Sequence, residues 1–482
     1  MLTIEYLNES FIRAYSDSVA IEQELADRYT FDYPGAKYTP QFKAKIWDGK
    51  VRLYNTQEKT IFKGLRDHIV QWTTENNIPI QYVNYTKQSI PDSKLIIDFL
   101  DSIHSNPPLR AYQLNAIIYA ILNKRTVIVS PTGSGKSLII YLLIQWYLAQ
   151  NMKIMLVIPT TSLVVQMYHD FEEYSKSNNS NCIIIDQCQK LYSGFSKVLE
   201  KNVLITTWQS VYKQPAIWFN QFDVIIGDES HTFKASSLQS LMNKMTKTSI
   251  RIGTTGSLDN KKINNLVLEG LFGPIYKVTT TKSLQDSGQL AKLNITQLHL
   301  KYSPPAIPIK TIQQELKYLA TNNQRNKFIC NLALSLTGNT LILFQLVENH
   351  GIPLYNNLLE KTQQKVYCIH GGIEAQERED IRNILIKETN SILVASYGSM
   401  STGINIPSLQ NIIFASPTKS IIRVLQSIGR GLRLAENKTL CTLYDIADNL
   451  QVDNLSYKHA QDRLEIYQKE QFPFKIVNIN IR

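Results

Sequence analysis

Short apolar runs alternate with helix-like segments along most of the chain beyond residue 105. In the first series the runs are TVIVS (126–130), IMLVIP (154–159), VLITT (203–207), DVIIGDE (223–229) and SIRIGTTG (249–256). Strands of a parallel sheet that is covered on both faces read as continuous apolar runs, because neither side of the strand meets water. The pattern predicts an α/β domain built on a buried parallel sheet.

A second series of the same kind follows the proline-containing stretch YSPPAIP (302–308). Its runs are TLILFQ (340–345), KVYCIHG (365–371), SILVAS (391–396), NIIFASP (411–417) and LCTLYDI (440–446). This series predicts a second α/β domain in tandem with the first.

The first hundred residues read differently. Aromatic, basic and apolar residues alternate in strand-like fashion through TPQFKAKIWDGKVRLYN (39–55), and a helical run follows from Leu65 to Asn76. A turn-rich break begins at Asn106. We therefore predict three domains: a small α+β domain at 1–104, a first α/β domain at 105–295 and a second at 296–482.

The composition agrees with a folded protein of several domains. Hydrophobic residues make up 43% of the 482 residues and charged residues 19%. The apolar runs are too short to span a membrane, acidic residues stand where a signal peptide needs a basic start, and the five cysteines form no C-x-x-C pair. We expect a cytoplasmic protein without a disulfide framework or a zinc site.

The net charge of +11 favours polyanionic partners, since Lys and Arg contacts to phosphates release counterions. Charge alone leaves open a basic protein with no nucleic-acid role.

A phosphate-binding loop is the strongest motif. SPTGSGKS (130–137) follows the strand-like TVIV and opens an apolar helix. Glycines let the backbone approach a phosphate, Lys136 would reach the β and γ phosphates of ATP, and the Ser137 hydroxyl would bind Mg²⁺. The residues predicted to hold the nucleotide here are Thr132, Gly133, Ser134, Gly135, Lys136 and Ser137.

An acidic box, DESH (228–231), follows the apolar strand DVIIG. Its carboxylates would emerge at the carboxyl end of a strand, where open α/β sheets bind ligands. We expect Asp228 to bind Mg²⁺ and Glu229 to orient the attacking water.

These boxes, in this order, resemble those of superfamily-2 helicases, which implies two RecA-like domains with a cleft between them. By the same resemblance, Arg110 and Gln113 of LRAYQ (109–113) would contact the adenine. Thr254, Thr255, Gly256 and Ser257 match the motif that couples hydrolysis to movement, and the coupling candidates are Thr255, Gly256 and Ser257.

The second domain carries QSIGRGLR (426–433), which is similar to the arginine-finger motif of these helicases. The resemblance places Gln426, Arg430 and Arg433 opposite the γ-phosphate, where guanidinium groups stabilise charge on the transferring group. Hydrolysis would then require closure of the two domains.

Further helicase motifs would contact nucleic acid. Within ASYGSMSTGINIP (395–407), Thr402 matches a nucleic-acid contact and Gly403 and Asn405 match nucleotide contacts, although many relatives carry Asp where Asn405 stands. Thr160, Thr206 and Thr207, in PTTS and TTW, match residues that grip the sugar-phosphate backbone.

The N-terminal region has a concentrated positive charge. Between residues 37 and 66 there are eight Lys and Arg residues against two acidic ones, with aromatic residues interleaved. The candidate DNA contacts are Lys43, Lys45, Trp47, Lys50 and Arg52. A solvated face of a scaffold domain is the alternative.

FKAKIWDGKVRL (42–53), TTWQSVYKQPAIWF (206–219) and LQSIGRGLRL (425–434) resemble the UvsW family of phage helicases nearly end to end. The resemblance implies ATP-dependent unwinding of branched DNA (Holliday junctions, stalled forks, D-loops and R-loops) in the host cytoplasm during recombination, repair and replication. The same resemblance makes recombination proteins or single-strand-binding proteins candidate partners. An RNA helicase and an ATP-switched DNA-binding or annealing factor are the alternatives.

Overall fold

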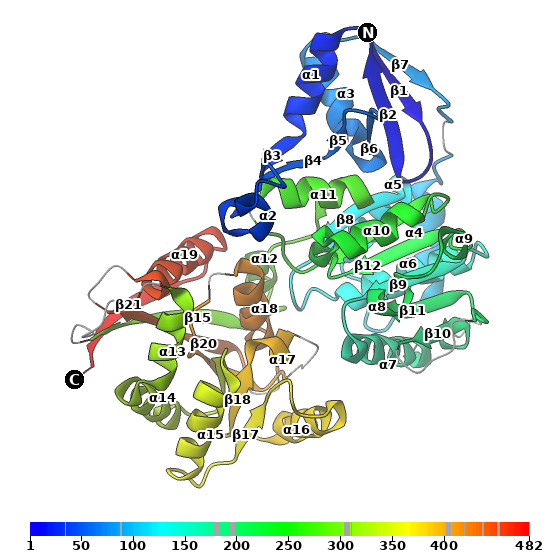
Figure 1. Ribbon diagram of the computed structural model, residues 1–482. Coiled ribbons are helices and arrows are strands. Elements are labelled where there is room, and N and C mark those ends of the chain that lie inside the picture. The colour runs from blue at the N-terminus through cyan, green and yellow to red at the C-terminus, as the bar shows by residue number, and fades with distance from the viewer. Residues whose placement is uncertain are drawn as a thin grey trace. The chain divides into compact units, whose positions relative to one another are not determined.

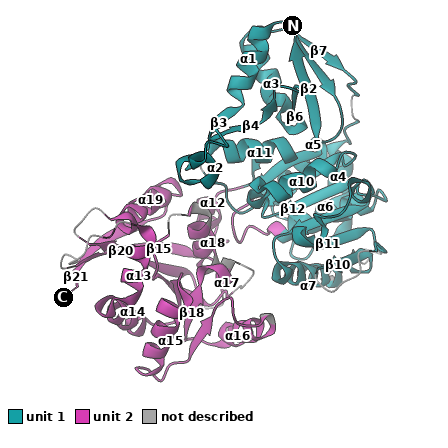
Figure 2. Ribbon diagram, in the orientation of Figure 1, with its two compact units in different colours: residues 1–129, 137–278 teal, residues 130–136, 279–482 magenta. Residues whose placement is uncertain are grey.

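The structure is a computed structural model (Figure 1) that describes residues 1–482 except 34, 87–88, 178–183, 193–197, 260, 303–308, 310, 402–405, 419, 436–437, 451–453 and 482. The chain divides into two compact units (Figure 2). Unit 1 comprises residues 1–129 and 137–278, and unit 2 comprises residues 130–136 and 279–482.

Unit 1 is built on a seven-stranded sheet in which every pairing is parallel, in the order β10-β11-β9-β12-β13-β8-β14. The strands are β8 (Arg125–Val129), β9 (Ile154–Ile158), β10 (Cys188–Leu191), β11 (Val203–Thr207), β12 (Val224–Asp228), β13 (Ile250–Thr255) and β14 (Ile275–Lys277). Every residue of β9, β11, β12 and β13 is buried, which explains why these strands are mostly apolar. The predicted parallel sheet is confirmed.

Helices cover this sheet. They are α4 (Ser93–Ile103), α5 (Ala111–Asn123), α6 (Lys136–Leu148), α7 (Thr161–Ser177), α8 (Trp208–Val211), α9 (Ala216–Phe219), α10 (Ser236–Lys244) and α11 (Lys262–Phe272). Helix α6 is buried on nearly every side, in keeping with its apolar sequence. Helix α4, which precedes the predicted domain limit at 104/105, packs its buried residues Ile96, Leu100 and Ile103 into the same core as α5 and α6.

The N-terminal module has its own five-stranded mixed sheet, in the order β5-β6-β2-β1-β7. Its strands are β1 (Leu2–Tyr6), β2 (Phe11–Ser16), β5 (Tyr54–Asn55), β6 (Thr60–Phe62) and β7 (Ile80–Val83), with helices α1 (Val19–Arg28) and α3 (Arg66–Glu75). A separate ribbon pairs β3 (Thr30–Asp32) with β4 (Lys50–Arg52). This arrangement confirms the predicted small α+β fold.

The strand-like reading of residues 39–55 is wrong before Lys50, where β4 begins, and Pro40–Lys43 form helix α2 instead. The hydroxyl of Thr39 accepts a hydrogen bond from the backbone N–H of Phe42, and Pro40 occupies the first helical turn. A Thr-Pro pair is a local signal for a helix start, and it prevails here over the alternation of side-chain types.

Close backbone contacts fasten the module to the rest of unit 1. Gly64, in the single-turn segment Lys63–Leu65, lies so near α11 that a Cβ atom would stand 2.0 Å from the carbonyl oxygen of Glu269. The buried guanidinium of Arg125 donates to the carbonyl oxygen of Glu9 at 2.8 Å. Apolar residues of the module and of the large sheet also share one core cluster. The module and the first α/β domain therefore form one compact unit.

Unit 2 contains a second seven-stranded sheet whose pairings are all parallel, in the order β17-β18-β16-β19-β20-β15-β21. The strands are β15 (Lys292–Lys301), β16 (Asn339–Phe344), β17 (Val366–Ile369), β18 (Ile392–Ser396), β19 (Leu409–Phe414), β20 (Leu440–Asn449) and β21 (Phe474–Asn480). The fold class predicted from the sequence, two tandem RecA-like parallel-sheet domains behind a small α+β domain, is confirmed.

The helices of unit 2 are α12 (Thr281–Asp286), α13 (Ile312–Thr321), α14 (Asn323–Ser335), α15 (Ile352–Leu359), α16 (Ala375–Lys387), α17 (Tyr397–Ser401), α18 (Ile421–Gly431) and α19 (Leu455–Lys469). The predicted domain limits stay predictions, and the one at 295/296 falls inside β15.

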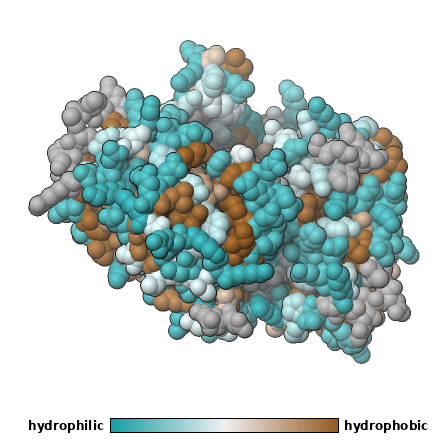
Figure 3. Space-filling model, turned by 90° about the horizontal axis from the view of Figure 1, so that it is seen from below, coloured by the Kyte–Doolittle hydropathy of each residue, from teal (hydrophilic) through white to brown (hydrophobic). Residues whose placement is uncertain are grey.

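On the face drawn in Figure 3, apolar side chains form small brown patches interrupted by teal polar surface. Among the described residues, none of the helices is both long enough and apolar enough to cross a membrane.

Candidate nucleotide site and nucleic-acid surface

The phosphate loop connects β8 to α6, as the sequence predicts. Gly133 and Gly135 have positive φ angles of 84° and 82°, which other residues rarely adopt. The hydroxyl of Ser134 donates to the carbonyl oxygen of Pro131 at 2.6 Å, and its oxygen lies 2.5 Å from that of Ser130. Ser130 is fully buried, so the position of the first motif glycine accepts a small side chain that also bonds within the loop.

Lys136 and Ser137 are the first residues of α6, where backbone N–H groups and the helix dipole favour an anion. The Ser137 hydroxyl lies 3.0 Å from the hydroxyl of Tyr174 in α7. The Tyr174 ring contacts the Tyr141 ring edge-on, with their centroids 5.3 Å apart. Sequence reasoning missed Tyr174, because no local motif marks a residue that reaches the loop through packing.

Asp228 ends β12 and is 95% buried, at the carboxyl edge of the sheet where the sequence places it. Thr254 lies beside it in register on β13, and the Thr254 hydroxyl donates to Asp228 Oδ1 at 2.9 Å. The acidic box and the predicted coupling motif are therefore joined directly, through Thr254, the first residue of that motif.

Glu229 begins the turn after β12 with a left-handed φ of 48°, which directs the box away from the strand. His231 Nδ1 lies 3.2 Å from Glu229 Oε2 and 3.0 Å from Thr255 Oγ1. Because the Thr255 hydroxyl donates to the carbonyl oxygen of Ser257, it accepts from His231, and the proton therefore resides on Nδ1. His231 thus links the predicted base to the predicted coupling motif.

The residues present suit Mg²⁺, which prefers hard oxygen ligands. Asp228 would supply a carboxylate and Ser137 a hydroxyl, the donor set that ATP-hydrolysing proteins with this loop use together with nucleotide phosphates.

The predicted adenine contacts lie at the start of α5. The backbone N–H of Arg110 donates to Gln113 Oε1 at 3.0 Å, and the Arg110 guanidinium donates to the Tyr112 hydroxyl at 2.8 Å. Gln113 is buried and caps the helix in this structure. The adenine role stays a prediction.

In unit 2, the predicted arginine-finger motif forms helix α18 and the residues after it. Gln426 and Arg430 belong to the helix, and Arg433 follows its end. The side chain of Arg430 lies outside the described residues, as do Thr402, Gly403 and Asn405. The predicted roles of these residues stay predictions.

A buried ion pair in unit 2 binds the backbone of Thr418, which precedes α18. Arg463 of α19 pairs with Asp445 of β20 at 2.7 Å, and the same guanidinium donates to the carbonyl oxygen of Thr418 at 2.8 Å. Both charged side chains are at most 1% exposed. Breaking such a pair typically costs about 3 to 5 kcal/mol, so the guanidinium that binds the Thr418 carbonyl is firmly fixed.

The three threonines predicted to grip a nucleic-acid backbone make contacts within the protein. Thr160 precedes α7, and its hydroxyl accepts from the N–H of Leu163 at 3.4 Å. Thr206 is fully buried and donates to the carbonyl oxygen of Leu191 at 2.8 Å. The Thr207 hydroxyl lies 2.9 Å from that of Ser210. Each of them positions a strand or helix end, and their nucleic-acid role stays a prediction.

The N-terminal basic candidates surround the β3–β4 ribbon. Lys43, Lys45 and Lys50 are exposed, and Trp47 is half-buried with its indole N–H donating to the carbonyl oxygen of Lys50 at 2.8 Å. Arg52 pairs with Asp48, and this hydrogen bond lowers the pKa of the Asp48 carboxyl to about 2. The net positive charge at this ribbon therefore comes from the lysines.

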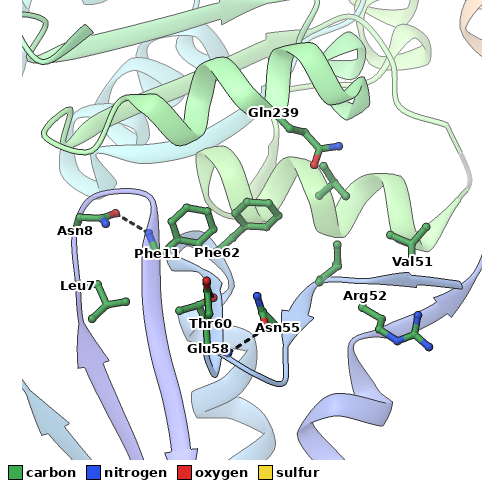
Figure 4. Close-up of a pocket in the computed structure, with 12 residues that line it drawn as sticks. Leu7, Asn8, Phe11, Val51, Arg52, Asn55, Glu58, Thr60, Phe62 and Gln239 are labelled. Atoms are coloured by element: carbon green, nitrogen blue, oxygen red, sulfur yellow. Dashed lines mark hydrogen bonds between the residues drawn. The ribbon is translucent and has the colours of Figure 1, made fainter. Parts of the chain in front are cut away.

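A groove of about 490 Å³ lies between the module and helices α10 and α11 (Figure 4). Phe11 and Phe62 line it from the module, Gln239 lines it from α10, and Arg52 stands at the β4 side. Its lining contains none of the predicted nucleotide-binding residues.

Three family models match the chain. Residues 3–83 match the family described as DNA helicase UvsW, N-terminal; residues 106–260 match Type III restriction enzyme, res subunit; and residues 324–435 match Helicase conserved C-terminal domain.

Individual proteins are also similar. The chain is 32% identical over 488 residues to the ATP-dependent DNA helicase uvsW of Enterobacteria phage T4, covering 95% of each chain. The crystal structure of T4 UvsW is 27% identical with full coverage of both chains and a TM-score of 0.49. The structure of the Type ISP restriction-modification enzyme LlaBIII bound to DNA is 14% identical, with a TM-score of 0.58. The match covers 77% of this chain and 31% of the LlaBIII chain.

Proposed function

The chain belongs to the UvsW family of ATP-dependent DNA helicases, and from this premise we propose that it acts on branched DNA. The activities proposed are branch migration of Holliday junctions, regression of stalled forks, and unwinding of D-loops and R-loops, in recombination, repair and replication. The similar helicase comes from a phage, so we propose the host cytoplasm as the place of action.

One observation carries the branched-DNA assignment. The module that bears the exposed lysines is joined to the ATPase sheet through buried polar contacts, including the 2.9 Å hydrogen bond from Arg251 to Ser10. A duplex arm held by this module would therefore stay fixed relative to the ATPase sheet during translocation. A motor that tracks one strand while holding a second arm is suited to a branch point.

The protein's residues divide the ATPase reaction among them. Lys136 binds the β and γ phosphates, and the loop N–H groups surround them. Ser137 and Asp228 would hold Mg²⁺, whose charge would offset that of the phosphates. Glu229 orients the attacking water, and His231 orients Glu229 through the 3.2 Å contact. The guanidinium groups of Arg430 and Arg433 would stabilise the charge that develops on the γ-phosphate.

Thr254 and Thr255 would couple this chemistry to movement. Their hydroxyls bond to Asp228 and His231, so a change in the charge around the phosphates alters the hydrogen bonding at the end of β13. We infer that this strand end carries the signal toward the segments that contact DNA.

Turnover and substrate preference test the proposal. Purified protein with Mg²⁺ and ATP should hydrolyse ATP faster with DNA than without, and Lys136→Ala should abolish that turnover. Forks and four-way junctions should be unwound faster than tailed duplexes of equal length. Equal rates on both substrates, activity confined to RNA duplexes, or turnover no higher than that of Lys136→Ala would each contradict the proposal.

A further inference from the structure

The segment between β3 and β4 forms a small folded knob, residues 35–49, whose apolar side chains lie on the outside. Ile46 is 80% exposed, Tyr38 is 72% exposed and Phe42 is 38% exposed. Figure 1 shows the knob, marked by α2, at the end of the β3–β4 ribbon. Large apolar side chains gathered on so small a surface indicate a binding role.

The exposure does not come from a loose chain, because the knob is internally bonded. Backbone hydrogen bonds join Lys45 to Phe42 and Ile46 to Gln41, each at 3.0 Å. The Phe42 ring packs against Gly49, whose φ is 78° and where a Cβ atom would lie 2.9 Å from the ring. Ile46 is thus presented outward by an ordered turn.

Charge complementarity points to nucleic acid as the occupant. Lys37, Lys43 and Lys45 belong to the same short segment as the apolar side chains, and Asp48, the single acidic residue among 35–49, is paired with Arg52. The Lys37 ammonium lies 5.1 Å from the Tyr38 ring centroid, so cation and aromatic face are presented together. Cations that bind phosphates beside apolar groups that contact bases are the combination found in proteins that unstack DNA.

The ribbon connects the knob to the ATPase domain. At the end of the ribbon that leads into the knob, Asp32 of β3 stands opposite Lys50 of β4 in the strand register. At the adjacent pair, the Lys262 ammonium of α11 lies 5.9 Å from the Phe31 ring centroid. A load on the knob is therefore received by α11 and the sheet beneath it.

We propose that the knob is a strand-separating wedge, in which Ile46 and Tyr38 contact the exposed base pair at the branch point while the lysines bind the flanking phosphates. This inference rests on the proposed function and specifies how the branch is opened. The lysines and the apolar residues then have different roles. The lysines determine the affinity for DNA, whereas the apolar residues determine how many base pairs are opened for each ATP hydrolysed.

The double variant Ile46→Ser with Tyr38→Ser tests the wedge, because both side chains are exposed and the change leaves the knob's backbone bonds in place. We expect the number of base pairs separated per ATP hydrolysed on a synthetic fork to fall about tenfold. Val19→Ser is the matched control, since Val19 is 81% exposed in the same module outside the knob, and it should leave this ratio unchanged.

A second readout reports on the bases directly. A fork with 2-aminopurine at the first paired position should become more fluorescent when wild-type protein and a non-hydrolysable ATP analogue bind, and the double variant should lose that increase. Equal yields per ATP, or an equal fluorescence rise, in wild type and double variant would overturn the wedge alone. Failure of the wild type to unwind any branched DNA would overturn the proposed function and the wedge with it.

Discussion

The guanidinium of Arg251, in β13, donates a 2.9 Å hydrogen bond to the hydroxyl of Ser10 in the N-terminal module. Both residues are buried, and the Ser10 hydroxyl is also 3.1 Å from the carbonyl oxygen of Met242. The other end of the same strand carries Thr254 and Thr255, which bond to Asp228 and His231. One strand therefore connects the module to the acidic box of the ATPase.

Ser10→Ala should weaken the attachment of the module. The change removes the hydroxyl that accepts a hydrogen bond from the Arg251 guanidinium and donates one to the Met242 carbonyl oxygen. We therefore expect the free energy of unfolding to fall by about 1 to 3 kcal/mol. Urea denaturation followed by tryptophan fluorescence measures it. Ser102→Ala, which alters an exposed serine of α4, is the control. A loss no larger than that of the control would contradict the structural role of this contact.

Gly64→Ala should disturb the same interface by a steric route. The added Cβ would meet the carbonyl oxygens of Glu269 and Gly270, at 2.0 and 2.6 Å, and backbone atoms cannot move aside cheaply. We expect a loss of more than about 2 kcal/mol in the free energy of unfolding, with faster proteolytic release of the module. Gly371→Ala is the control because open space surrounds that position. Equal effects of both substitutions would count against the close approach.

Thr254→Val should impair ATP hydrolysis. It keeps the side-chain shape but removes the hydroxyl that donates to Asp228, and a hydrogen bond to a charged group is worth about 1.5 to 3 kcal/mol. We expect DNA-stimulated turnover to fall about tenfold or more, with a higher Mg²⁺ concentration needed for half-maximal rate. Thr248→Val removes a similarly buried hydroxyl, bonded to the carbonyl oxygen of Phe222, and should cost stability without changing the Mg²⁺ requirement. Indistinguishable Mg²⁺ titrations would refute the coupling.

Replacing Lys43, Lys45 and Lys50 with Gln should weaken binding to four-way junctions. On duplex DNA, the plot of log affinity against log salt has a negative slope, and each lost phosphate contact makes it shallower by about 0.9. We therefore expect the magnitude of the slope to fall by about 2 to 3. Fluorescence anisotropy at several salt concentrations measures the slope. The exposed lysines Lys94, Lys201 and Lys247, changed in the same way, provide a control of equal charge. If both triple variants had the same slope, the ribbon would not be a DNA contact.

The ion pair between His68 of α3 and Glu269 of α11 should make the module interface sensitive to pH. The hydrogen bond to Glu269, at 3.1 Å, raises the pKa of His68 above its usual 6.5. A raised pKa in the folded state means that the stabilisation is complete below about pH 6.5 and is lost as the pH rises through the folded pKa. His68 is 36% exposed, so solvent screening limits the contribution to a few tenths of a kcal/mol.

Thermal unfolding of the wild type and His68→Gln measures this contribution. The difference in midpoint should be largest near pH 6 and should shrink as the pH rises through the raised pKa of His68. A difference that grew with increasing pH would have the wrong sign for this ion pair.

Local sequence patterns predicted the ATPase motifs better than the contacts that join those motifs to the rest of the protein. The loop glycines at 133 and 135 have the positive φ angles that the motif requires, and Asp228 ends a buried strand as expected. Thr39 and Pro40 signal helix α2 locally, and this signal prevails over the alternation of aromatic and basic residues that predicts a strand. Tyr174 had no local signal at all.

The sequence by itself determined the two parallel sheets, the phosphate loop and the acidic box, because these depend on unbroken apolar runs and on short motifs whose backbone geometry is local. Only the tertiary structure decided that His231 meets Thr255, that Tyr174 reaches Ser137 and that Arg251 reaches Ser10. The last two residues are separated by 241 positions in the chain. Such contacts depend on how complete elements pack against one another, and a pattern of neighbouring residues does not record that packing.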